Sequence, residues 1–110
     1  MKIFCNKKLI AKNICDCKGI KSLFGLRFKK SFKPYDCYLI YMLFDSALDS
    51  FFVNFPFYAI WINKEGVVLK VEKCKKNKFF KPVIGQSKVI ELPANRKINI
   101  AIGDKLIIKK

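Results

Sequence analysis

Residues 35–63 read YDCYLIYMLFDSALDSFFVNFPFYAIWIN, and this stretch decides the fold. It contains no lysine or arginine, but it holds ten of the sixteen aromatic residues of the chain. The flanks are strongly basic, since residues 1–34 carry ten Lys or Arg against one acid and residues 64–110 carry thirteen against four. Aromatic side chains bury large apolar areas, whereas charged side chains stay in water. The central stretch therefore predicts the core, and the flanks predict its solvated surface.

The length of 110 residues predicts one domain with a hydrophobic core of its own. Hydrophobic residue types make up 52% of the chain, a share that excludes intrinsic disorder. Asp45 and Asp49 interrupt the apolar central stretch and Pro56 breaks its second half, so no membrane-spanning helix is predicted. The apolar segment at the N-terminus is too short for a signal peptide, and we expect a cytoplasmic protein.

The clearest local pattern is a β-hairpin around the turn at residues 63–66. Residues 59–63 have the composition of a strand, and residues 67–73 alternate, with Val67, Leu69 and Val71 on one face. Residues 37–44 form a nearly continuous apolar run of strand length, which indicates burial on both faces. Further strands are predicted at residues 8–14 and 88–92, and residues 98–102 and 106–108 predict a second hairpin.

One short helix is predicted near residues 16–25. Ile20, Leu23 and Phe24 form an apolar stripe at helical spacing, Asp16 could cap it, and Gly25 is a stop signal. Successive strands with short turns pair antiparallel. The fold class predicted is therefore α+β, mainly β: a small curled or barrel-like, mostly antiparallel sheet of six or seven strands with one short helix.

Five cysteines and the absence of histidine restrict the available chemistry. With no export signal, we expect reduced thiols. Cys15 and Cys17 are separated by one residue rather than the two of a zinc knuckle, so no metal is expected, and no cofactor is predicted. A Ser or Cys nucleophile would lack a histidine base. Cys74 stands beside Lys73 and Lys75, which could activate a thiolate, although such a run is more often an exposed loop.

The net charge of +15 raises the possibility of nucleic-acid binding. A basic run followed by an aromatic residue is typical of single-strand binding by charge and stacking; the residues concerned are Lys73, Lys75, Lys76, Lys78 and Phe79. The alternative is an exposed loop whose two phenylalanines, 79 and 80, pack back onto the core. Only two of the 23 basic residues are arginine, the type that phosphate and base recognition favour, so a solvated surface is favoured.

Four segments that follow one another along the chain carry a family resemblance. They are GLRFKK at 25–30, FFVNFPFYAIWINKEGVV at 51–68, VIELP at 89–93 and IGDKL at 102–106. In this order they resemble the DUF192 (UPF0127) family of small bacterial and archaeal domains, over most of the chain from about Ile10. The resemblance implies a compact β-rich fold with a short helix. It implies no activity, because the family has no established function.

This chain departs from the family pattern at several polar positions. Arg27 stands where the family has Met, Asp49 where it has His, and Tyr58 where it has Asp. Asn95 replaces a glycine after the Glu-Leu-Pro-Ala run. Any reactive site that the family's polar residues form would be incomplete here, which lowers the expectation of catalysis.

Two functions from different classes remain, with an enzyme as a third. The aromatic excess predicts a non-catalytic binding or interaction domain with an apolar, aromatic-lined cleft for a small apolar ligand or a protein partner. The candidate cleft residues are Arg27, Phe51, Phe52, Tyr58, Trp61, Glu91 and Asp104. The alternative is the basic single-stranded nucleic-acid module, and an enzyme would require Arg27, Glu91 and Asp104 to converge. The competing structural interpretation is that Asp104 closes a turn and Glu91 pairs with a basic residue across strands.

Overall fold

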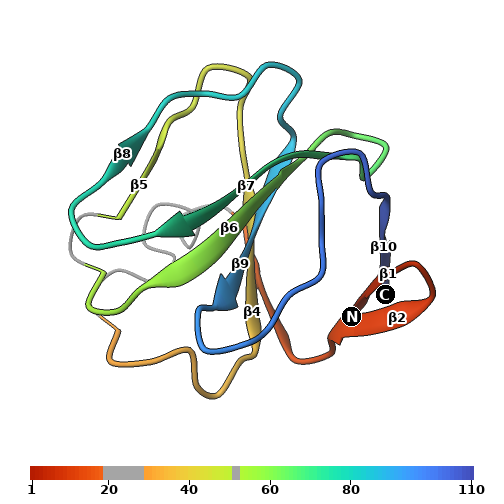
Figure 1. Cartoon of the computed structure of the whole chain (residues 1–110), viewed down its shortest axis with the longest axis horizontal. Helices are drawn as coiled ribbons and strands as arrows, with labels where there is room; N and C mark the ends of the chain where they lie inside the picture. Colours follow the sequence, from red (N-terminus) through yellow and green to blue (C-terminus); the bar gives the residue numbers. More distant parts are fainter. Residues whose placement is uncertain (19–28, 51–52) are drawn as a thin grey trace.

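The computed structural model describes residues 1–18, 29–50 and 53–110, and its ten strands form three sheets (Figure 1). The central sheet has five strands in the order β3-β4-β9-β6-β7. Their bounds are β3 (Ile14–Cys17), β4 (Cys37–Tyr41), β6 (Phe57–Ile62), β7 (Val68–Cys74) and β9 (Lys88–Pro93). Strands β3 and β4 run parallel, and the other neighbours run antiparallel. The predicted antiparallel character is thus confirmed, with one parallel pair at the edge.

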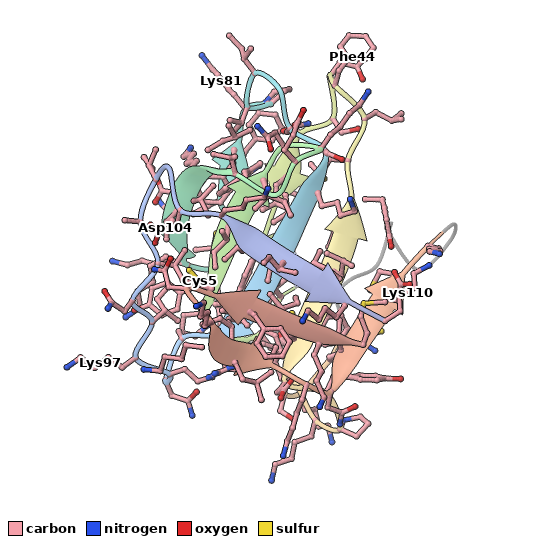
Figure 2. The ribbon with its side chains drawn as sticks, turned by 90° about the vertical axis from the view of Figure 1, so that its right-hand side faces the viewer. Cys5, Phe44, Lys81, Lys97, Asp104 and Lys110 are labelled. Carbon is pink, nitrogen blue, oxygen red and sulfur yellow. The ribbon has the colours of Figure 1, made fainter. Side chains whose placement is uncertain are left out.

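A three-stranded sheet covers one face of the central sheet (Figure 2). It consists of β10 (Leu106–Lys109), β1 (Lys2–Cys5) and β2 (Lys8–Ala11), with β1 in the middle. Lys2 pairs with Lys109, so the two ends of the chain lie side by side. Beyond the other face of the central sheet, β5 (Leu48–Asp49) pairs with β8 (Phe79–Phe80).

Both faces of the central sheet are buried, and the alternation of side chains divides them into two cores. We call the first the aliphatic core, between the two larger sheets, because it includes Ile3, Leu39, Ile60, Ile90, Leu92 and Leu106. We call the second the aromatic core, because it includes Phe32, Tyr38, Phe57 and Trp61. Residues 37–40 are all buried, and this confirms the predicted two-sided burial for the first half of the apolar run. The prediction is wrong for the second half, because β4 ends at Tyr41 and Leu43 and Phe44 are 71% and 83% exposed.

The predicted hairpin is confirmed as β6 and β7. Asn63 closes the turn, because its backbone N–H donates to the Val67 carbonyl and its side-chain Oδ1 accepts from the Val67 and Glu65 N–H groups. The ladder has an irregularity at Trp61, which shifts the register. In consequence Val68, and not Val67, is the buried residue at the start of β7. The buried and exposed positions at the start of this strand are therefore shifted by one residue from those that the sequence predicts.

Several details of the predicted fold are wrong. The strands form three sheets instead of one curled sheet, and they do not close into a barrel. Residues 98–102 form no strand, because β10 takes β1 as its partner instead. Asp16 lies within β3 rather than capping a helix. The apolar stripe predicted as helical lies outside the described residues; the described ranges contain no helix.

No helix long and apolar enough to cross a membrane occurs in residues 1–18, 29–50 or 53–110.

Candidate functional site

The described members of the predicted cleft lie on two faces of the central sheet. Trp61 is fully buried in the aromatic core, and Glu91 points to the same side because its cross-strand neighbours are Tyr38 and Ala59. Tyr58 packs against the aliphatic core on the opposite face. Asp104 also lies on that side, near Cys5 (Figure 2). The other three predicted residues, at positions 27, 51 and 52, lie outside the described residues.

Asp104 has a structural role in the turn before β10. Its Oδ2 accepts a 2.9 Å hydrogen bond from the Ala101 N–H, and the Cys5 thiol donates to the same oxygen at 3.8 Å. This confirms the interpretation that Asp104 closes a turn. Burial and the Asp104 carboxylate both raise the pKa of the Cys5 thiol, so the thiol stays protonated as a donor.

The two carboxylates considered for acid–base catalysis do not meet. Glu91 is 4% exposed and faces the aromatic core, whereas Asp104 lies on the aliphatic side. A pair of catalytic groups must reach the same substrate atoms, and a buried sheet separates these two. The convergence of Glu91 with Asp104 that an enzyme would require therefore does not occur. The pairing of Glu91 with a basic residue stays a prediction; its neighbours in the β4 and β6 ladders are Tyr38 and Ala59.

All five cysteines are buried, and they are not disulfide-bonded. Burial raises the pKa of the Cys74 thiol to about 12, and the nearby Glu91 and Glu72 act in the same direction. The idea that lysines activate Cys74 is therefore wrong, because the thiol is withdrawn from solvent and protonated at neutral pH. Burial likewise raises the pKa of Cys17 to about 12, and its Sγ lies 3.6 Å from that of Cys15.

An open cleft lies beside the aromatic core, at the end of the central sheet where β4 and β6 begin and β9 ends. We call it the aromatic cleft; its volume is about 500 Å³. Three segments line it: residues 30–36, Phe55 with Pro56, and the turn at 93–96. The turn is closed by a hydrogen bond from the Arg96 N–H to the Pro93 carbonyl. The cleft is thus lined by loops that adjoin the ends of three strands, β4, β6 and β9.

Aromatic rings in edge-to-face and tilted contact form the wall of the aromatic cleft. The ring centroids of Phe32 and Phe55 are 5.5 Å apart, and those of Phe32 and Tyr38 are also 5.5 Å apart with the rings nearly perpendicular. Tyr35 meets Tyr38 edge to face at 5.7 Å. Each lining ring is therefore anchored on a neighbour that belongs to the buried core, which keeps the wall rigid.

The rim of the aromatic cleft is basic. Lys30, Lys33 and Arg96 border it together with one acid, Asp36. Asp36 is engaged in structure, because its carboxylate accepts hydrogen bonds from the Lys12 and Asn13 N–H groups at 3.4 and 3.0 Å. Arg96 donates at 2.6 Å to the Ile10 carbonyl. The two lysines are exposed, so an apolar ligand in the cleft would meet free positive charge at its mouth.

The basic run after β7 is exposed, as its lysines predict. Phe80 packs edge to face on Trp61 at 5.9 Å, whereas Phe79 is 62% exposed. The expectation that both phenylalanines pack onto the core is therefore wrong for Phe79. Lys73, near the end of β7, and Lys75, Lys76 and Lys78, in the segment that follows it, are all exposed.

Sequence reasoning missed the three rings that line the aromatic cleft. Tyr35 follows Pro34 and Phe55 precedes Pro56, whereas Phe32 lies two residues before Pro34. An aromatic residue beside a proline sits in a loop whose backbone is restrained, and this pattern could have marked Tyr35 and Phe55 as surface anchors. Trp61, the largest ring and a predicted cleft residue, is instead buried in the interior.

Comparison with known proteins supports the fold and assigns no function. No family model matches the sequence, and no curated protein matches it. Among solved structures, the chain is similar to a protein of unknown function from Novosphingobium aromaticivorans. The TM-score is 0.82 at 10% sequence identity, over 97% of this chain and 84% of that one. At this identity the likeness concerns the fold alone, which the two proteins share.

Proposed function

We propose that this protein is a non-catalytic binding domain that takes a small ligand with an apolar body and an anionic end in the aromatic cleft. The observation that carries the proposal is the pairing of a rigid aromatic wall, formed by Phe32, Tyr35 and Phe55, with exposed Lys30 and Lys33 at the rim. Small-molecule sites are concave and mostly apolar, with a few polar groups that orient the ligand. A volume of about 500 Å³ lies within the range that such sites have.

The proposal is tested with the fluorescent probe 1-anilinonaphthalene-8-sulfonate, which combines aromatic rings with an anionic group. We expect saturable binding that Ser31→Trp abolishes, because Ser31 is exposed on the lining and a large ring there would fill the cleft. Lys33→Gln should weaken binding about threefold to tenfold through lost charge attraction. Lys97→Gln, an exposed lysine outside this cleft, should leave it unchanged.

The chemical class of the ligand is tested by displacement. Octanoate should displace the probe at lower concentration than octanol, because only the carboxylate meets the basic rim. Equal displacement by both would show that the rim charge contributes nothing. Probe binding that is unchanged in Ser31→Trp would place the ligand elsewhere and refute the proposal.

Single-stranded nucleic-acid binding is a second candidate, which the exposure of Phe79 favours. A ring that is 62% exposed and follows four exposed lysines in the sequence can stack on a base while the lysines contact phosphates. Binding of a single-stranded oligonucleotide should then weaken steeply with salt and should fall in Phe79→Ala. No binding at low salt would remove this candidate.

Membership of the DUF192 (UPF0127) family remains a proposal. It is supported by the order of the four segments and by the β-rich fold of the described residues, which include 53–68, 89–93 and 102–106 of these segments. The Gly103-Asp104 segment forms a tight turn with Gly103 at a φ of +94°, and the Val-Ile-Glu-Leu-Pro segment belongs to β9, in the middle of the central sheet. An alignment that contains intermediate sequences would test it: related sequences should keep Gly25, Glu91 and Gly103.

A further inference from the structure

Two loops at the other end of the central sheet carry three large apolar side chains that point into solvent. Leu43 is 71% exposed, Phe44 is 83% exposed and Ile84 is 97% exposed. They belong to residues 42–47, which follow β4, and residues 81–87, which precede β9. Because Tyr41 pairs with Lys88, these two loops emerge side by side from adjacent strands. We call the pair of loops the apolar tip (Figures 1 and 2).

A buried glutamine holds the two loops of the apolar tip together. The side-chain amide of Gln86 donates hydrogen bonds to the carbonyl oxygens of Leu43 at 2.6 Å and Ser46 at 2.8 Å. Its Oε1 accepts from the Val83 N–H at 2.9 Å, so one side chain closes its own loop and clamps the other. Gln86 is only 6% exposed. The exposed side chains therefore stand on a preorganised support, and fixing them on a partner costs little further ordering.

The apolar tip is surrounded mainly by positive charge. Lys81 begins the second loop and Lys88 follows it, and Lys88 shares a cleft of about 480 Å³ with Lys64 and Lys105. Their acidic neighbours in this region are Asp45, within the first loop, and Glu65, on the wall of that cleft. The whole chain carries +15. Projecting apolar side chains with cations behind them match the layers of an anionic bilayer, with hydrocarbon beyond charged headgroups.

We propose that the apolar tip docks this protein on an anionic membrane surface, with Leu43, Phe44 and Ile84 inserted among the lipids. A bilayer can close around projecting side chains, whereas a protein partner would need a matching pocket for each of them. A stable protein interface also covers about 800 Å² on each partner, far more than three side chains supply. The aromatic cleft lies at the opposite end of the sheet, so docking leaves it open to solvent.

The experiment is co-flotation of the full chain with vesicles of phosphatidylcholine that contain phosphatidylserine, compared with vesicles of phosphatidylcholine alone. We expect binding to the anionic vesicles that weakens as salt is added. The double variant Phe44→Ser with Ile84→Ser should bind at least tenfold more weakly, because both apolar contacts are lost. Ile102→Ser is the matched control, since Ile102 is 70% exposed on a different loop, and it should bind as the wild type does.

Charge variants test the orientation independently of the apolar contacts. Lys81→Glu should weaken binding more than Lys97→Glu, which makes the same change away from the tip (Figure 2). Asp45→Asn should strengthen binding, because it removes a carboxylate that the headgroups repel. Circular dichroism must show each variant folded.

Three results would overturn the proposal. The first is equal binding to neutral and anionic vesicles. The second is vesicle binding that the double variant retains. The third is a wild-type dimer in gel filtration that the double variant converts to monomer, since the tip would then be an interface between two copies of this chain.

Discussion

The Leu106 N–H donates a 2.8 Å hydrogen bond to the carbonyl oxygen of Gly66, and this contact joins the β6–β7 turn to the first residue of β10. Gly66 has a φ of +86°, and a Cβ at this position would lie well inside van der Waals contact with the Leu106 carbonyl oxygen. The turn approaches the strand this closely only because residue 66 has no side chain.

Replacement of this glycine should be far more costly than replacement of another glycine with similar backbone geometry. Gly66→Ala should lower the free energy of unfolding by about 3 kcal/mol or more, since left-handed strain and a backbone clash add. Gly103 has a φ of +94° and open space where a Cβ would stand, so Gly103→Ala should cost only about 1 kcal/mol. Urea unfolding measures the stability of both variants. Equal losses of stability would contradict the close approach of Gly66 to the Leu106 carbonyl oxygen.

Trp61 provides a direct test of the aromatic core. It is the one tryptophan of the chain and is fully buried, so its emission should be blue-shifted and resistant to acrylamide quenching until the protein unfolds. Trp61→Ala should cost about 3–5 kcal/mol, whereas Phe79→Ala should change stability by less than about 0.5 kcal/mol. Urea unfolding followed by circular dichroism measures both. A native emission maximum at the value of free tryptophan would contradict the burial.

The buried thiols should make the protein unstable in alkali. Burial raises the pKa of Cys17 and of Cys74 to about 12, from an ordinary value of 9.0. Above about pH 9 the unfolded chain releases these protons while the folded chain keeps them, so the unfolded state gains stability. The free energy of unfolding should be insensitive to these groups below about pH 8 and should fall as the pH rises from 9 toward 12. Urea titrations over this range measure the slope.

The control for the alkaline slope is Cys17→Ala. Removing this thiol should make the decline between about pH 9 and 11 shallower, even if the variant is less stable at neutral pH. The other buried thiols, whose pKa values are also raised, should keep part of the slope. Tyr38 contributes in the same direction at higher pH, because burial raises its pKa from 10.0 to about 12. An unchanged slope in Cys17→Ala would show that this thiol does not titrate as its burial requires.

Gln86 should be a stabilising residue although it is polar. Gln86→Ala removes three hydrogen bonds and leaves the Leu43 and Ser46 carbonyls without their partner, so a loss of about 3 kcal/mol is expected. Lys97→Ala, at a solvent-exposed position, should change stability by less than about 0.5 kcal/mol. The midpoint of urea unfolding distinguishes the two variants. A loss of stability below about 1 kcal/mol in Gln86→Ala would mean that water replaces the hydrogen bonds of the Gln86 side chain.

The parts of the fold that sequence could predict are those fixed by neighbouring residues. The β6–β7 hairpin is one, because Asn63 and Gly66 supply the turn and the two strands adjoin it. The burial of residues 37–40 on both faces is another, since an apolar strand has no polar side to expose, but the same apolar run continues into the exposed Leu43 and Phe44. The aromatic cluster also follows from composition, because many aromatic rings in a stretch without basic residues are expected to be buried together.

The remaining features depend on partners that are distant in sequence. Nothing near residues 106–108 indicates that β10 pairs with β1 rather than with residues 98–102. The rings of the aromatic cleft come from two separate loops, and only their packing on Tyr38 and on one another brings them together. The apolar tip likewise depends on Gln86, whose contacts reach back 43 and 40 positions. Local sequence patterns do not specify such contacts between residues that are distant in sequence.

The antiparallel contact between Lys2 and Lys109 has a consequence for biosynthesis. While the ribosome is still extending the nascent chain, β1 has its hairpin neighbour β2 available but lacks the strand that covers its other edge. The three-stranded sheet can be completed only after the last residues of β10 leave the exit tunnel, so this side of the molecule must be finished after translation has passed residue 109.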